Sequence, residues 1–254
     1  MILSNENFQI IITPNYSEFC KKGAEVIYEL SKAAIHRKNH FTLALSGGVT
    51  PKGVYQAISE EPYLDSFIWK KIHLFWGDER WLPPENKENN YHMVSEALLK
   101  KIQIPKDNIN PIRTEEIDPE DSAAYYEADI CSFLSKDKKR TPQFDLTILG
   151  LGDDGHTASL FPNSESLTAT EKLVVPTIKK DSAQKRITFT YPLINASKNI
   201  LFLVSGKKKA GKVKAVLEGN HPNYEIPAAG IRPTDGKVIW ILDSDAASLL
   251  SPSS

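Results

Sequence analysis

The chain has 254 residues, of which 41% are hydrophobic and 25% are charged, so it is long enough to bury a substantial core. Its net charge of −1 gives no electrostatic reason to expect nucleic acid or an anionic membrane as a partner. The N-terminus shows no signal peptide or membrane span, and the two cysteines fit no zinc or redox spacing. These features predict a cytoplasmic protein.

Strands and helices alternate along the chain. Strands are predicted at 8–13, 41–45, 71–76, 144–149, 173–177, 186–191, 199–204 and 237–242. Helices are predicted at 16–38, 51–58, 90–100 and 119–135, and a last helix follows the lysines at 207–209 and ends near 217. This alternation, without a repeat or a long linker, predicts a single α/β domain over residues 1–254. Its core is expected to be a doubly wound, mostly parallel sheet flanked by helices.

The stretch FDLTILGLGDDGHTASLFP at 144–162 carries the densest group of candidate site residues. It begins as an apolar strand, typical of one covered on both faces, and then breaks into a glycine-rich loop. Asp153, Asp154 and His156 stand in that loop, at the carboxyl end of the strand, where open α/β sheets bind their ligands. We interpret the loop as functional; the alternative is an ordinary turn with a surface histidine.

Three other loops are expected at the same edge of the sheet. The SGGVTP segment at 46–51 leads into a helix with Thr50 as candidate N-cap, so free N–H groups and the helix dipole could hold an anion there. The Asp-Glu-Arg segment at 78–80 is expected to be a turn after a buried strand, or else a solvated charge cluster. The lysines at 207–209 oppose the dipole of the helix that they precede, which a bound anion would relieve.

Neither a metal nor a cofactor is expected. No His/Cys cluster with ligand spacing is present in the sequence. The glycines at 150–155 have the wrong spacing for a dinucleotide fingerprint, and the turn at 46–51 lacks the lysine of a P-loop.

Together these segments resemble the family of 6-phosphogluconolactonases and glucosamine-6-phosphate deaminases. The matching segments are SGGVTP at 46–51, GDERWLP at 77–83, LGLGDDGHTASLFP at 149–162, RIT at 186–188, SGKKKA at 205–210, IPAAGI at 226–231 and VIWILDSDAA at 238–247. The deaminases usually have Asp-Glu-Tyr in the second segment and Asn-Glu-Pro after the histidine, so the resemblance favours the lactonases. Val49 and Asn89 depart from frequent hydroxyl residues, and the second departure puts the cap of the following helix in doubt.

The resemblance implies a modified Rossmann-like fold and hydrolysis of 6-phospho-D-glucono-1,5-lactone to 6-phospho-D-gluconate, the second step of the oxidative pentose phosphate pathway. It implies that His156 is the base that activates water. Either Asp154 or Glu79 would orient the histidine ring, and Arg80 would donate to the lactone or to the phosphate.

The resemblance also implies a phosphate site and a partner class. The phosphate is expected to bind Ser46, Gly47, Gly48, Thr50, Arg186 and Lys209, with Asp78 and Gly155 completing the pocket. The partner is expected to be a small phosphosugar lactone, and the protein a monomer or weak homo-oligomer. Two alternatives are a deaminase-type sugar-phosphate isomerase and a non-catalytic sugar-phosphate sensor.

Overall fold

The computed structural model describes residues 2–5, 7–115, 118–135, 140–179 and 182–251. Its centre is an eight-stranded sheet with the order β1-β2-β11-β10-β7-β3-β4-β6. The strands are β1 (Ile2–Asn5), β2 (Phe8–Thr13), β3 (Phe41–Leu45), β4 (Ile72–Trp76), β6 (Ile109–Asn110), β7 (Leu146–Leu149), β10 (Asn199–Val204) and β11 (Lys237–Asp243). Only the pairing of β1 with β2 is antiparallel, so the prediction of a mostly parallel sheet is confirmed.

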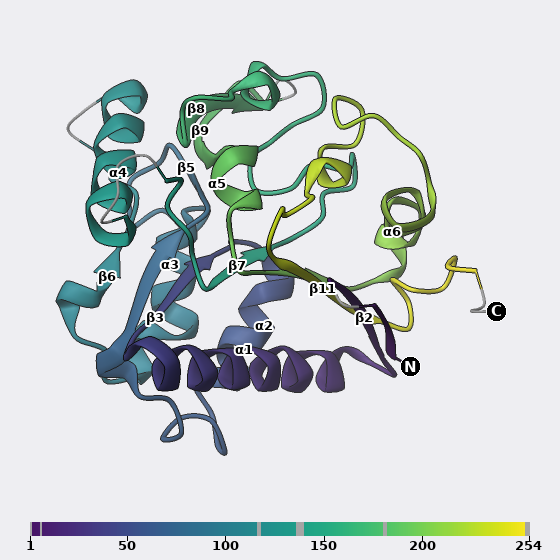
Figure 1. Ribbon diagram of the computed structural model, residues 1–254, viewed down its shortest axis with the longest axis horizontal. Helices are drawn as coiled ribbons and strands as arrows, with labels where there is room; N and C mark the ends of the chain where they lie inside the picture. Colours follow the sequence, from purple (N-terminus) through teal and green to yellow (C-terminus); the bar gives the residue numbers. More distant parts are fainter. Residues whose placement is uncertain (1, 6, 116–117, 136–139, 180–181, 252–254) are drawn as a thin grey trace.

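Helices cover both faces of this sheet (Figure 1). They are α1 (Tyr16–Lys38), α2 (Val49–Ile58), α3 (Asn90–Ala97), α4 (Pro119–Leu134), α5 (Tyr191–Asn195) and α6 (Ala210–Glu218). Helices α1 and α2 lie below the sheet in Figure 1, and α4, α5 and α6 lie above it. This layering confirms the doubly wound architecture. None of the helices in the described ranges is long and apolar enough to cross a bilayer.

The strand order creates a crevice between β3 and β7. After β3 the chain moves outward through β4 and β6, whereas after β7 it moves in the opposite direction through β10 and β11. β3 and β7 are nevertheless neighbours in the sheet, with Leu43 opposite Leu146. The loops that follow them therefore diverge, and such a switch point is where open α/β sheets bind ligands.

A second sheet of three antiparallel strands lies on the α4 side of the large sheet (Figure 1). It consists of β5 (Asp78–Arg80), β8 (Val174–Lys179) and β9 (Gln184–Phe189). The prediction that 78–80 form a turn is therefore wrong: they are the edge strand β5, too short to show an alternating pattern. Aromatic packing holds this sheet against the segment that leads into β7, because the ring of Phe144 stacks on that of Phe189 with 5.5 Å between ring centroids.

Two helix boundaries also differ from expectation. Helix α2 begins at Val49 with Gly48 at the N-cap, so Thr50 lies inside the first turn and does not cap it. Helix α3 ends at Ala97 and not at 100, whereas the lysines at 207–209 precede α6 as expected and form a 3₁₀ turn. Helix α3 keeps its cap despite the doubt raised by Asn89, whose side-chain oxygen accepts a hydrogen bond from the His92 N–H at 3.1 Å.

Candidate functional site

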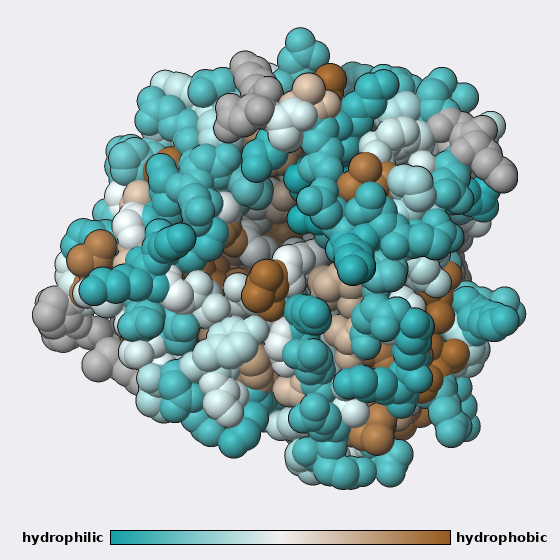
Figure 2. Space-filling model, turned by 180° about the vertical axis from the view of Figure 1, so that it is seen from behind, coloured by the Kyte–Doolittle hydropathy of each residue, from teal (hydrophilic) through white to brown (hydrophobic). Residues whose placement is uncertain are grey.

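A cavity of about 590 Å³ opens at the carboxyl ends of β3 and β7. Figure 2 shows it as a hollow near the middle of the face turned away from the viewer of Figure 1. Ten residues predicted from the sequence line it: Ser46, Gly47, Gly48, Thr50, Asp78, Arg80, Asp154, His156, Arg186 and Lys209. Two others, Glu79 and Gly155, do not line it. The loops after β3 and β7, strand β5, strand β9 and the start of α6 thus meet at one place.

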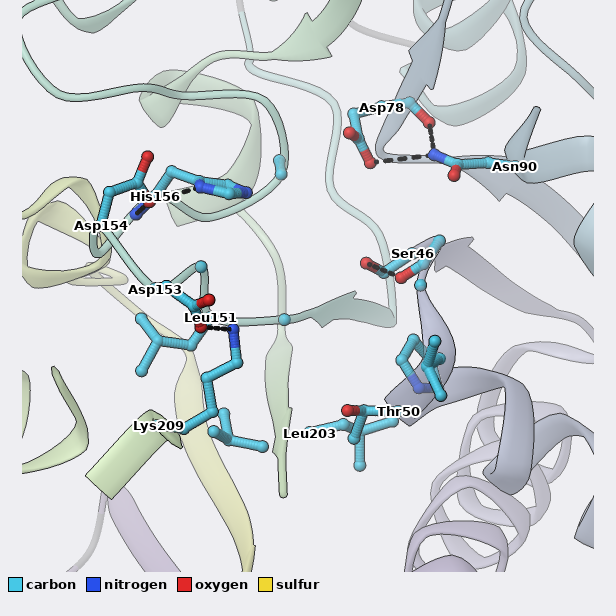
Figure 3. A pocket seen from close by; sticks show the side chains of 18 of the residues that line it. Ser46, Thr50, Asp78, Asn90, Leu151, Asp153, Asp154, His156, Leu203 and Lys209 are labelled. Atoms are coloured by element: carbon cyan, nitrogen blue, oxygen red, sulfur yellow. Dashed lines mark hydrogen bonds and ion pairs between the residues drawn. The ribbon is translucent and has the colours of Figure 1, made fainter. Parts of the chain in front are cut away.

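The loop after β7 holds a histidine–carboxylate pair at the cavity wall (Figure 3). Nδ1 of His156 lies 2.5 Å from Oδ1 of Asp154, and the same oxygen accepts the His156 backbone N–H at 3.0 Å. Burial alone would raise the pKa of Asp154, but hydrogen bonds from His156 outweigh it and lower the pKa to about 2. An ionised Asp154 fixes the proton on Nδ1, which leaves Nε2 able to accept one.

Glycine is required at position 152 because the histidine pair occupies the space of its side chain. A Cβ there would lie 2.0 Å from His156 Nδ1 and 2.6 Å from Asp154 Oδ1. The turn is closed by the Gly152 N–H, which donates to the His156 carbonyl at 2.8 Å. Gly155 has φ +93° and packs against Ile226 outside the cavity, so it shapes the loop and does not contact the cavity.

Glu79 lies outside the cavity and does not contact His156. Its two carboxylate oxygens accept backbone N–H groups from Asn90 at 2.6 Å, Arg80 at 2.7 Å and Tyr91 at 2.8 Å. Burial raises the pKa of Glu79 to about 7, although these three hydrogen bonds act in the opposite direction. Of the two carboxylates weighed as partners of the histidine, Asp154 is the one bonded to it, and Glu79 binds the first turn of α3.

The turn after β3 directs the N-terminus of α2 into the cavity. Tyr55 fixes the first residue of this turn, because the Tyr55 hydroxyl accepts a hydrogen bond from the Ser46 N–H at 3.1 Å and donates one to the Ser46 carbonyl at 2.9 Å. Gly48 adopts φ +103°, a conformation that favours glycine. The N–H groups of the first helical turn and the helix dipole make this a suitable place for an anion.

Asn90 also lines the cavity and was not predicted from the sequence. Its side-chain N–H donates to the Asp78 carbonyl at 2.9 Å. Its Oδ1 lies only 1.8 Å from the position of a Cβ on Gly47, so residue 47 must be glycine for Asn90 to fit. Asn90 thereby ties the turn after β3 to strand β5. No local pattern identifies it, because the contact joins segments far apart in the sequence.

Two arginines stand side by side at the cavity. Arg80 on β5 is directly opposite Arg186 on β9 in the antiparallel register. Within the described part of the chain, the Nε atoms of both are buried and have no hydrogen-bond partner. Burial lowers the pKa of Arg186, the carboxylate of Asp78 acts in the opposite direction, and the nearby charge of Arg80 lowers the pKa further. Like charges in directly opposite positions are unfavourable, so an anion between them would be stabilising.

Four further charged groups line the wall. Nζ of Lys209 lies 2.5 Å from Oδ1 of Asp153. Lys179 on β8 also lines the cavity and was not predicted as a site residue. Asp78 is buried and accepts a hydrogen bond from the Ser159 hydroxyl at 2.6 Å. Among the described residues, no group of three or more His, Cys, Asp or Glu side chains could hold a metal ion.

Known proteins share this fold and sequence. The family profile described as glucosamine-6-phosphate isomerases/6-phosphogluconolactonase matches residues 14–240. A relative from Synechocystis sp., named 6-phosphogluconolactonase, is 40% identical, covering 86% of this chain and 88% of its own. Another with that name, from Haemophilus influenzae, is 37% identical over 89% of this chain and 91% of its own. The solved structure of 6-phosphogluconolactonase from Trypanosoma brucei is 28% identical, with TM-score 0.84, covering 95% of this chain and 98% of its own. The chain belongs to the family of glucosamine-6-phosphate isomerases and 6-phosphogluconolactonases.

Proposed function

We propose that this chain hydrolyses 6-phospho-D-glucono-1,5-lactone to 6-phospho-D-gluconate, the second step of the oxidative pentose phosphate pathway. The observation that carries the proposal is the His156–Asp154 pair, 2.5 Å apart, at a cavity that is also lined by Arg80, Arg186 and Lys209. A base beside cationic side chains that can bind an anion fits a substrate that has both an ester carbonyl and a phosphate.

The reaction needs one proton acceptor and one anion-stabilising donor. Nε2 of His156 takes a proton from water while the water oxygen attacks C1 of the lactone, and Asp154 stabilises the imidazolium that forms. The bond between C1 and the ring oxygen then breaks, and that oxygen receives the proton from His156. A δ-lactone is already activated, so no covalent nucleophile is required.

The phosphate is assigned to the cation-rich part of the cavity. The N-terminus of α2 offers the N–H groups of Gly47 and Gly48 and the Thr50 hydroxyl, and Arg186 and Lys209 supply positive charge. Arg80 stands opposite Arg186, so it can reach either the same phosphate or the oxyanion that develops on the lactone.

The segment after the histidine supports a lactonase over a deaminase. The deaminases resembled by this chain usually have Asn-Glu-Pro there, whereas this chain has Ser159 followed by buried Leu160 and Phe161. Ser159 donates to the buried carboxylate of Asp78, and the Phe161 ring lies 4.9 Å from the His156 ring. The segment TASLFP at 157–162 therefore has no carboxylate in place of the glutamate of the deaminases.

A coupled assay tests the function. Glucose-6-phosphate dehydrogenase generates the lactone in place, and its removal is followed against spontaneous hydrolysis. We expect rapid removal and no ammonia release from glucosamine 6-phosphate. Ammonia release would support the deaminase alternative, and binding of 6-phosphogluconate with hydrolysis at only the spontaneous rate would support a non-catalytic sensor.

A further inference from the structure

Lys209, a proposed phosphate ligand, is already engaged by a carboxylate of the cavity wall. Its ammonium nitrogen lies 2.5 Å from Oδ1 of Asp153. Both residues line the cavity, and Figure 3 shows the lysine extended toward Asp153, on the side of the cavity away from Ser46 and Thr50. The cation that a phosphate would need is therefore neutralised by the protein's own acid.

The backbones of both partners are held in place. Asp153 follows Gly152, whose N–H and carbonyl are bonded to His156 at 2.8 Å and to the Gly155 N–H at 3.1 Å. The turn before Lys209 is anchored by the Gly206 N–H, which donates to the Asp243 carboxylate at 3.0 Å. The ammonium group can change partner by rotation of its flexible side chain, while the backbone of Asp153 remains part of the cavity wall.

The pair is easily exchanged. The Asp153 side chain is 72% exposed and that of Lys209 25% exposed, so water can replace the lysine at the carboxylate. Ion pairs with such exposure contribute little to stability. A phosphate monoester has nearly two negative charges and three strong acceptor oxygens, which makes it the better partner for the ammonium.

We propose that Asp153 competes with the phosphate of the substrate for Lys209 and so weakens the binding of the phosphorylated substrate and product. This inference rests on the proposed function. When the phosphate takes Lys209, the negative charge of Asp153 remains close to it, and the repulsion between like charges limits the affinity. Ring opening adds a carboxylate to the product, so the same charge also favours product release. Asp153 is thus a positioning residue that sets affinity through Lys209.

Direct binding measurements with Asp153→Asn test this role. The substitution keeps the side-chain shape and removes the charge. We expect the dissociation constants of 6-phosphogluconate and inorganic phosphate, measured by calorimetry at low ionic strength, to fall by roughly three- to tenfold. Binding of unphosphorylated gluconate should change much less. The control Asp245→Asn alters the net charge equally at an exposed position outside the cavity and should leave the constants unchanged.

Opposite results would overturn the inference. If Asp153 instead orients Lys209 toward the ligand, Asp153→Asn will bind phosphate more weakly or equally. The companion variant Lys209→Met should bind phosphate more weakly than the unmodified protein. Unchanged binding would mean that Lys209 does not bind the phosphate, so that Asp153 cannot compete for it.

Binding and turnover separate this inference from the function on which it rests. A protein that binds 6-phosphogluconate but does not hydrolyse the lactone contradicts the function, while the sign of the Asp153→Asn effect still decides the role of Asp153. A protein that binds neither phosphate compound overturns both.

Discussion

The turns after β3 and β7 each need a glycine because a polar side chain fills the space of its Cβ, but those side chains come from different places. At Gly152 the nearby atom is Nδ1 of His156, from the same loop, at 2.0 Å. At Gly47 it is Oδ1 of Asn90, from helix α3, at 1.8 Å. The loop after β7 therefore positions its own titratable pair, whereas the turn after β3 depends on a distant element. This difference suggests that the loop after β7 serves the chemistry and that the turn after β3 serves the binding of substrate.

The largest effect is expected from Gly152→Ala. The new methyl group would overlap the His156 ring and force it away from Asp154, so kcat should fall by about 10² or more with a small change in KM. The coupled lactone assay measures both constants. Gly211→Ala, at an open position in α6, is the matched control and should keep full activity. A change in KM with an unchanged kcat would contradict the different roles assigned to the two turns.

Arg186→Ala should resemble a defect of the binding turn. Loss of a charge-assisted contact to phosphate is worth about 1.5–3 kcal/mol, so KM for the phosphorylated lactone should rise by roughly ten- to a hundredfold. KM for unphosphorylated gluconolactone should rise far less, because that substrate offers nothing for Arg186 to bind. Equal increases for the two substrates would show that Arg186 does not recognise the phosphate.

Gly47→Ala should give a smaller change of the same kind. Its methyl group would displace Asn90 from the Asp78 carbonyl and disturb the N-terminus of α2. We expect KM to rise about tenfold and the free energy of unfolding to fall by about 1–3 kcal/mol. Steady-state kinetics and urea denaturation measure these quantities. A loss of kcat as large as that of Gly152→Ala, at unchanged KM, would contradict the assignment of this turn to binding.

The last prediction concerns the pH dependence of stability and should affect activity least. Glu79 binds the first turn of α3 and so supports Asn90. Its pKa is raised to about 7 from 4.5, so between these values the folded protein binds more protons than the unfolded chain. Stability should therefore fall as the pH rises through this range and level off above it, by at most about 3 kcal/mol.

Glu79→Gln checks this origin of the pH dependence. The slope of unfolding free energy between pH 5 and pH 8, from urea denaturation, should flatten in the variant. Asp154, with a pKa of about 2, stays ionised throughout this range, so its carboxylate should not contribute to the slope. An unchanged slope would mean that Glu79 is already ionised at pH 5.

The large sheet could be predicted because its inner strands are continuous apolar runs that end in glycine loops. The same pattern placed His156 at the carboxyl end of β7. Strand β5 was not predicted, because three residues show no periodicity and two of them, Asp78 and Glu79, are acids normally expected at the surface. Its pairing with β9 depends on the fold of the whole chain.

Long-range contacts explain the other differences. Asn90 meets Gly47 only after helix α3 has packed beside α2, and Glu79 becomes a helix-binding carboxylate for the same reason. The pairing of Lys209 with Asp153 joins the loops after β10 and β7, so the lysine selected by its position in the motif could not be seen to have an internal competitor. Sequence patterns give the elements and their order, but not which side chains meet across loops.

The most direct test of the central claim is kcat of His156→Asn for freshly generated 6-phospho-D-glucono-1,5-lactone, with folding checked by circular dichroism. If Nε2 of His156 activates water, kcat should fall by about 10² or more while 6-phosphogluconate binds with nearly unchanged affinity. A folded variant whose kcat equals that of the unmodified protein would contradict the account.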